Sequence, residues 1–149
     1  MVSKRILPPD LKTAVLYFVG IKGTGMSALA ELMQSHGARV SGSDTEEHFY
    51  TDAILTSLGI PYYEGFRAEN VPTEVDLVVY SAAYDPLTHP ELSEARRRGI
   101  PIVEYTAALG ELSRDLHATG IAGVHGKTTT TAMAGTIVKE LNLPVSVLV

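Results

Sequence analysis

The stretch Thr13–Ser27, TAVLYFVGIKGTGMS, decides the fold. Its first part, Thr13–Val19, is a run of β-branched, aromatic and aliphatic residues, which predicts a buried strand. Gly20–Gly25 then predicts a glycine turn, and apolar residues at helical spacing follow it as far as Gly37. A strand that passes through a glycine turn into a helix is the opening of a β-α-β unit.

The alternation of strands and helices continues to about residue 117. Further strands are predicted at Arg39–Ser43, Tyr62–Glu64, Leu77–Tyr80 and Ile102–Glu104, and further helices at Thr45–Leu58, Glu91–Arg98 and Ala107–Leu116. This pattern predicts an α/β fold with a Rossmann-like, doubly wound, mainly parallel sheet over residues 13–117. Residues 1–12 are polar and contain Pro8-Pro9, so we expect a leader tied down loosely if at all.

The pattern restarts near Thr119. Thr119–Val124 predicts a strand and Pro144–Val149 the beginning of another. Between them Thr128–Leu141 predicts a helix whose inward-pointing residues are Met133, Ile137, Val138 and Leu141. A lone β-α-β unit cannot cover both of its faces, so we interpret residues 118–149 as the truncated start of a second α/β domain. We expect this tail to be disordered, to pack on the first domain, or to pair with another chain as a homodimer.

The composition argues against several classes of protein. The chain carries 12 Lys+Arg against 17 Asp+Glu, a formal charge of −5, which disfavours a protein held to nucleic acid by phosphate attraction. The absence of cysteine excludes a disulfide framework, a thiolate metal site and a thiol nucleophile, and it fits a reducing compartment.

The apolar stretch Thr13–Ile21 follows basic residues, as the core of a signal peptide would. However, Lys22 and a glycine cluster interrupt it, and it is shorter than the roughly 20 residues that a membrane span needs. We therefore favour a buried strand, no membrane partner and a cytoplasmic location.

The first glycine loop has the spacing of a nucleotide site. Gly23, Gly25 and Ala28 match G-x-G-x-x-[GA] between a predicted strand and a predicted helix. Glycines let a pyrophosphate approach the backbone, and a helix N-terminus supplies free N–H groups and partial positive charge. Asp44 ends the second strand, 19 residues after Gly25, where a carboxylate can bond a ribose hydroxyl.

Other residues are candidates for the same ligand. Lys22 could reach a phosphate, or its side chain could simply be solvated. Ser81-Ala82-Ala83 follows a buried strand, near the point where ligands bind in doubly wound sheets; a tight loop without a ligand is the alternative. The candidate set for a ligand with a pyrophosphate and a ribose is Gly20, Lys22, Gly23, Thr24, Gly25, Met26, Ser27, Asp44, Ser81 and Ala82. A glycine turn with no ligand also stays open.

A second phosphate loop is predicted at Gly123–Thr131, GVHGKTTTT. The strict P-loop pattern is not met, because Ile121 occupies the first glycine position, but G-x-x-G-K-T remains. Lys127 can neutralise charge on the β- and γ-phosphates of ATP, and the Thr128 hydroxyl can join the Mg²⁺ shell. The candidate ATP-binding set is Gly123, Val124, His125, Gly126, Lys127, Thr128 and Thr129, with Lys127 and Thr128 as catalytic residues and Thr128 as the Mg ligand. The alternative is an N-cap built from threonine hydroxyls.

With both loops considered, the sequence resembles the Mur ligases, which build the bacterial cell-wall peptide. The resemblance is carried by FVGIKGTGMS (18–27), SGSD (41–44) and GVHGKTTTT (123–131), with Tyr80–Ala83 and Gly99–Val103 between them. It favours the branch that joins L-alanine to UDP-N-acetylmuramate. A branch that reattaches recycled tripeptide shares both motifs and is the alternative. The family usually has Gly where Lys22 stands and Thr where Val124 stands.

The resemblance implies an ATP- and Mg-dependent ligase of peptidoglycan precursor synthesis, and hence a role in cell shape and cell division. In this family ATP phosphorylates the muramate carboxylate, the amine of L-alanine attacks the acyl phosphate, and phosphate leaves. The first domain would hold the UDP-sugar, and residues 118–149 would begin the P-loop ATPase domain. Because family members are considerably longer, we expect a fragment that binds UDP-sugar without ligase activity.

Two other functions remain as alternatives. An NAD-dependent dehydrogenase fits the first loop and Asp44, but it leaves the second loop unexplained, and no His/Asp or Tyr/Lys catalytic set is apparent. A nucleotide-sensing regulatory domain would leave Lys127 and Thr128 without a role.

Overall fold

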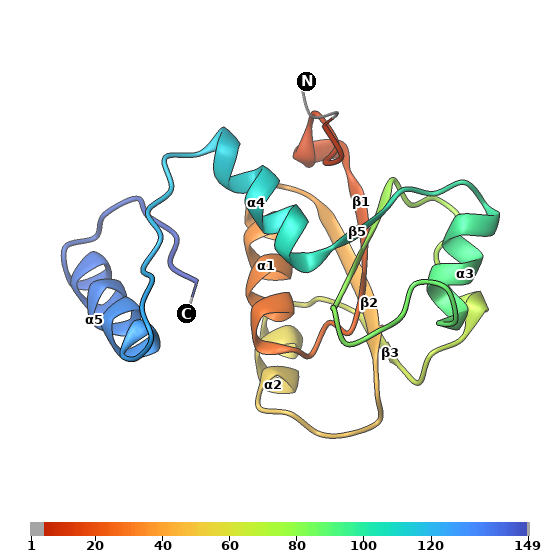
Figure 1. Ribbon diagram of the computed structural model, residues 1–149, viewed down its shortest axis with the longest axis horizontal. Coiled ribbons are helices and arrows are strands. Elements are labelled where there is room, and N and C mark those ends of the chain that lie inside the picture. Colours follow the sequence, from red (N-terminus) through yellow and green to blue (C-terminus); the bar gives the residue numbers. More distant parts are fainter. Residues whose placement is uncertain (1–4, 149) are drawn as a thin grey trace.

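The computed structural model describes residues 5–148 and contains one five-stranded, fully parallel sheet in the order β3-β2-β1-β4-β5 (Figure 1). The strands are β1 (Val15–Val19), β2 (Arg39–Asp44), β3 (Tyr62–Glu64), β4 (Leu77–Tyr80) and β5 (Ile102–Glu104). The helices are α1 (Thr24–Ser35), α2 (Thr51–Ser57), α3 (Pro90–Arg97), α4 (Tyr105–Asp115) and α5 (Lys127–Glu140), with short 3₁₀ turns at Leu11–Thr13 and Ala68–Asn70. The sheet grows outward from β1 in both directions, which confirms the predicted Rossmann-like fold and places its switch point between β1 and β4.

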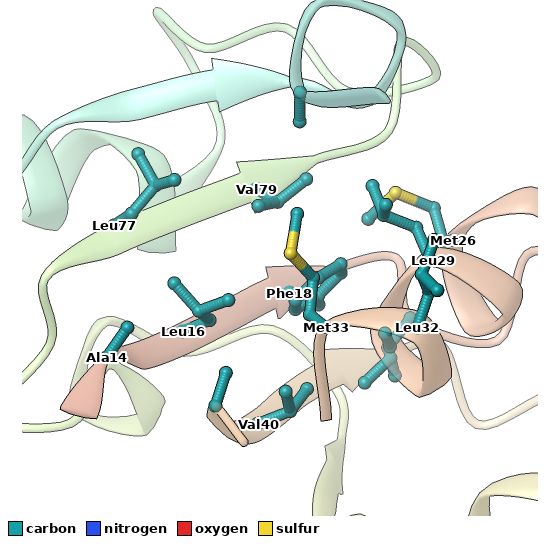
Figure 2. Packing of buried hydrophobic residues seen from close by; sticks show 14 of the residues in the cluster. Ala14, Leu16, Phe18, Met26, Leu29, Leu32, Met33, Val40, Leu77 and Val79 are labelled. Carbon is teal, nitrogen blue, oxygen red and sulfur yellow. The ribbon is translucent and has the colours of Figure 1, made fainter. Parts of the chain in front are cut away.

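Each face of the sheet is covered by helices, because the strands are apolar on both sides. Leu16 and Phe18 of β1 point toward α1, where Leu29 and Met33 meet them (Figure 2). Alternate residues point the opposite way, as the two-residue period of a strand requires. On that second face Leu92 and Ala95 of α3 pack against the strand residues Tyr17, Val19 and Val78. The ends of β1 and β2 are thereby fixed rigidly beneath the first glycine loop.

Two predicted elements differ from the structure near this sheet. Helix α2 begins at Thr51. The segment 45–50, which the sequence predicts to be helical, is not part of a helix. The described part of the leader, residues 5–12, is also tied down more firmly than expected. Leu7 is only 3% exposed within the core, and the N–H groups of Ile6 and Leu7 donate to Glu111 Oε1. An apolar residue in this leader therefore contributes to the core of the domain.

The tail forms a helix but no strand within the described residues. The strands predicted at Thr119–Val124 and Pro144–Val149 are absent from residues 119–148, and residue 149 lies outside the described part. Of the four residues expected to point inward, Val138 is half-buried, and the exposed ones are Met133, Ile137 and Leu141. The physical reason is that a strand needs a neighbouring strand to pair its backbone, and α5 stands apart from the α1 and α4 layer (Figure 1).

Candidate functional site

The first glycine loop is fastened to the carboxyl end of β2. The N–H groups of Gly20 and Ile21 both donate to the carbonyl oxygen of Ser43, at 2.8 and 3.1 Å. Gly20 has φ of +86°, and a Cβ built on it would lie 2.7 Å from Tyr84 Cε2. A side chain at this position would therefore be both strained and obstructed. The loop lies at the switch point of the sheet, where doubly wound folds bind ligands.

The N-terminus of α1 presents unpaired backbone donors. Among the described residues, no acceptor is found for the N–H groups of Thr24, Gly25 and Met26. The absence of a side chain at Gly25 keeps this turn narrow, because a Cβ there would lie 2.7 Å from Tyr105 Oη. Three free N–H groups and the positive end of the helix dipole form a cradle suited to an anion.

The side chains of two predicted ligand residues do not face this cradle. Met26 is buried in the hydrophobic core, and only its N–H is available. Ser27 is also buried, and its hydroxyl donates to the carbonyl oxygen of Thr24 at 3.0 Å. Gly23 donates its N–H to the carbonyl oxygen of Gly20 and closes the turn. These residues shape the loop, whereas Thr24 exposes its side chain.

Asp44 lies where the sequence predicts it, at the end of β2 beside the loop. Its Oδ2 accepts the N–H of Lys22 at 2.6 Å, and its Oδ1 accepts the N–H of Thr45 at 2.7 Å. A carboxylate oxygen can accept more than one hydrogen bond, so the orientation is fixed while acceptor capacity remains. The bond to a ribose hydroxyl stays a prediction.

The structure contradicts both expectations for the Lys22 side chain. The residue is 1% exposed, and its ammonium donates to the carbonyl oxygens of Thr45 and Glu47 and to Glu64 Oε1, at 3.0 to 3.1 Å. It lies 3.6 Å from Asp52 Oδ1. Burial alone would lower the pKa of Lys22, but these two carboxylates outweigh it, and the pKa is raised. The side chain is therefore a charged structural group and neither a phosphate contact nor solvated.

The segment after β4 approaches the glycine loop from the other side. The N–H of Ser81 donates to the carbonyl oxygen of Val19, and Ser81 Cβ lies 3.1 Å from where a Cβ on Gly20 would be. Ser81 Oγ accepts the N–H of Ala83, which tightens the turn and leaves Ala82 exposed. The predicted residues Ser81 and Ala82 are thus brought to the loop, and their contact with a ligand stays a prediction.

Three tyrosines that the sequence analysis missed surround the cradle. Tyr84 packs on Gly20, Tyr105 reaches Gly25, and the hydroxyl of Tyr50 donates to Thr24 Oγ1 at 2.8 Å. Burial, followed by the nearby charges of Asp44 and Glu91, raises the pKa of Tyr84 to about 12, so this phenol keeps its proton at neutral pH. Tyr50 precedes α2, Tyr84 follows β4, and Tyr105 is the first residue of α4. The one signal in the sequence is that Tyr84 and Tyr105 come shortly after predicted strands, at the edge of the sheet where ligands bind.

The second loop folds into the start of a helix as its motif predicts. Gly126 has φ of +78° and caps α5, and the N–H of Thr130 donates to its carbonyl oxygen. The ammonium of Lys127 donates to the carbonyl oxygens of Gly123 and Val124, at 2.8 and 3.4 Å. His125, Thr128 and Thr129 are exposed, so the loop is open to solvent.

This second loop fits phosphate oxygens better than it fits a metal alone. The N–H groups of Lys127, Thr128 and Thr129 have no acceptor in the part of the chain that the structure describes. No group of three or more His, Asp or Glu side chains within residues 5–148 is arranged to hold a metal ion. The hydroxyl of Thr128 would hold Mg²⁺ only together with phosphate oxygens and water.

Comparison with known proteins identifies the family. The protein-family model described as "Mur ligase family, catalytic domain" matches residues 15–117 of this chain. The chain belongs to the Mur ligase family. A UDP-N-acetylmuramate–L-alanine ligase from Treponema pallidum is 55% identical over 143 residues, which are 96% of this chain and 30% of the relative. One from Bdellovibrio bacteriovorus is 43% identical over 93% of this chain and 30% of the relative. The chain therefore spans about 30% of the length of these relatives.

Solved structures of Mur ligases share the fold. The UDP-N-acetylmuramate–alanine ligase MurC of Thermotoga maritima is 35% identical, with a TM-score of 0.78 over 87% of this chain and 30% of that one. The Neisseria meningitides ligase named for UDP-N-acetylmuramate and L-alanyl-γ-D-glutamyl-meso-diaminopimelate is 30% identical, with a TM-score of 0.75 over 88% of this chain and 41% of that one. The resemblance deduced from the two loops is confirmed at the level of the family.

Proposed function

We propose that this chain is the sugar-nucleotide-binding portion of a UDP-N-acetylmuramate–L-alanine ligase. In this proposal the loop Gly20–Ser27 holds the pyrophosphate and Asp44 bonds the ribose. The observation that carries it is the set of unpaired N–H groups at Thr24, Gly25 and Met26, beside a fixed carboxylate and at the switch point of the sheet. The identity to relatives that are named for UDP-N-acetylmuramate supports the choice of ligand.

The proposed activity of the whole enzyme is ATP-dependent ligation of L-alanine to UDP-N-acetylmuramate in peptidoglycan precursor synthesis. The muramate carboxylate takes the γ-phosphoryl group, the amine of L-alanine attacks the acyl carbon, and phosphate leaves as the amide forms. Lys127 would exchange the carbonyl oxygens of Gly123 and Val124 for phosphate oxygens and balance their charge. Mg²⁺ at Thr128 would supply further charge neutralisation.

This activity needs ATP, which fits a cytoplasmic location. No helix among the described residues is both long and apolar enough to cross a bilayer. We expect the 149-residue chain to bind UDP-N-acetylmuramate but not to ligate alanine, since its second phosphate loop is open to solvent and has no packed sheet around it. Alanine-dependent release of phosphate from ATP by this chain would contradict that expectation.

A second candidate is the ligase that attaches a tripeptide to UDP-N-acetylmuramate. Its Neisseria representative superimposes almost as well as the alanine ligase, with TM-scores of 0.75 and 0.78. The higher sequence identity to curated alanine ligases, up to 55%, favours alanine. Both candidates bind the same sugar nucleotide, so the proposed site is common to them.

A thermal unfolding series tests the ligand. UDP-N-acetylmuramate at 100 times its dissociation constant should stabilise the chain by about 2.7 kcal/mol, whereas NADH at the same concentration should not. The variant Gly25→Val should lose this stabilisation, because its side chain would enter the space beside Tyr105 Oη. Gly110→Val, with open space around a Cβ at that position, is the matched control and should keep the response. Stabilisation by NADH alone would favour a dehydrogenase instead.

A further inference from the structure

The segment 45–50, between β2 and α2, lies against the first glycine loop. It ends at Tyr50, whose side chain is 66% exposed although its hydroxyl is fixed on Thr24 Oγ1 at 2.8 Å. An exposed tyrosine gains little stabilisation from burial of its ring. The position of Tyr50 therefore depends on the contacts that the two ends of the segment 45–50 make with the glycine loop. The hydrogen bond crosses from this segment to the first residue of α1.

Lys22 fastens both ends of that segment to the glycine loop. Its ammonium donates hydrogen bonds to the carbonyl oxygens of Thr45 and Glu47, at the start of the segment. Its own carbonyl oxygen accepts the hydroxyl of Thr51, directly after Tyr50. The Lys22 side chain is fully buried, its bonds to Thr45 and Glu47 are partly buried, and the bond from Thr51 is buried, so these contacts hold the segment against the loop.

The direction of the Tyr50–Thr24 hydrogen bond leaves one proton available. The phenol is the more acidic of the two hydroxyls and therefore the better donor, which favours donation of its proton to Thr24 Oγ1 and leaves the threonine hydroxyl its own proton to donate elsewhere. Among the described residues, no acceptor is found for that proton. A hydroxyl that already accepts a hydrogen bond is a stronger and better oriented donor. Thr24 also carries one of the unpaired N–H groups of the cradle.

We propose that Tyr50 is a positioning residue for the sugar nucleotide: it holds the Thr24 hydroxyl ready to donate to a pyrophosphate oxygen, and Lys22 holds Tyr50 in place. The inference rests on the proposed function of the glycine loop. It assigns to Thr24 a side-chain bond in addition to its backbone N–H. It also gives the buried Lys22 a role in ligand binding that does not require contact with the ligand.

The test is a double-mutant cycle measured by calorimetric titration of the 149-residue chain with UDP-N-acetylmuramate. Tyr50→Phe should raise the dissociation constant roughly fivefold to tenfold, the usual effect of losing one hydrogen bond between neutral groups, here the bond between the Tyr50 and Thr24 hydroxyls. Thr24→Val should raise it at least as much, and adding Tyr50→Phe to Thr24→Val should cause no further loss. Tyr63→Phe is the matched control, because Tyr63 is also an exposed tyrosine, on β3, and it should bind as the parent chain does.

The outcomes separate this inference from the proposed function. If the parent chain does not bind UDP-N-acetylmuramate, the proposed function fails and this inference fails with it. If the parent binds and Tyr50→Phe binds equally well, the inference alone is overturned. Fully additive losses in the double variant would also overturn it, because Tyr50 would then act independently of Thr24. Lys22→Met, whose thermal transition shows whether it folds, should raise the dissociation constant for UDP-N-acetylmuramate as much as Tyr50→Phe does.

Discussion

The two glycine loops of this chain resemble each other locally and differ in what surrounds them. Each leads into the N-terminus of a helix, each has a glycine at positive φ, and each contains a lysine. Lys22 is buried and joins the loop to β3 and to the segment before α2. Lys127 is exposed, and within residues 5–148 its ammonium bonds only to carbonyl oxygens of its own loop. The motif thus specifies a cradle of N–H groups, and the surrounding sheet decides where the side chains go.

The largest difference between the two regions should appear in large-to-small substitutions. Leu29 of α1 is fully buried against the sheet, so Leu29→Ala should destabilise the chain by about 2–5 kcal/mol. Ile137 of α5 is exposed, and Ile137→Ala should change the free energy of unfolding by less than about 0.5 kcal/mol. Urea denaturation of both variants measures this. A large loss for Ile137→Ala would mean that α5 is packed in solution, as it would be in a homodimer formed through the tail.

Glycine substitutions sharpen the same contrast. A Cβ on Gly42 of β2 would collide with the carbonyl oxygen of Phe18, so Gly42→Ala should cost about 1–3 kcal/mol. A Cβ on Gly135 of α5 would make only an ordinary contact of 3.4 Å with Val147, and Gly135→Ala should leave the stability unchanged or slightly raised. Equal effects in thermal unfolding would show that the two regions are packed alike.

The two lysines provide a comparison within the loops themselves. Lys22→Met leaves the carbonyl oxygens of Thr45 and Glu47 without their donor and two carboxylates without their partner, so we expect a loss of about 1–3 kcal/mol. Glu64 is half exposed, and solvent limits this loss. Lys127→Met should cost less than about 0.5 kcal/mol, since its bonds are exposed. A reversed order in chemical denaturation would refute the structural role of Lys22.

A pH effect should arise in the packed region. His89 is 8% exposed, stacks against Phe66 and Tyr84, and has no partner for either ring nitrogen among the described residues. Burial lowers its pKa, so the unfolded chain binds a proton that the folded chain does not, and stability falls as the pH drops below about 6.5. The loss should approach 1.4 kcal/mol per pH unit at most.

His89→Asn should remove this component. The difference in unfolding free energy between the parent chain and this variant should change between pH 7 and pH 5 and not above pH 7.5. A difference that is constant across this range would show that the imidazole is solvated in both states.

Much of the fold could be predicted from sequence because local pattern and tertiary structure agree there. β3, β4 and β5 have the predicted bounds, since each is a short β-rich run flanked by turn residues. The error at α2 has a different origin. The carbonyl oxygens of Thr45 and Glu47 are used by Lys22, which is distant in sequence, and a helix would need those acceptors for itself. The prediction of strands in the tail was wrong because a strand forms only where a partner strand pairs with it, and the local sequence does not show whether that partner is present.

The candidate site could be predicted only as far as its backbone. The glycine spacing located the cradle, and the strand end located Asp44. The direction of the Lys22 side chain and the bond from Tyr50 to Thr24 depend on residues brought together by the fold. A lysine within a glycine loop suggests a phosphate contact by charge alone. The acidic side chains of Asp52 and Glu64 compete for it, and sequence order gives no measure of that competition.

The most direct test is an amide NMR titration of the chain with UDP-N-acetylmuramate. We predict that the resonances of Thr24, Gly25 and Met26, whose N–H groups have no acceptor among the described residues, move most. The resonance of Lys22, whose N–H is bound to Asp44, should move with them. NADH should leave them unmoved. If these four amides stay fixed while UDP-N-acetylmuramate shifts others, or if NADH alone moves them, the assignment of the first glycine loop is wrong.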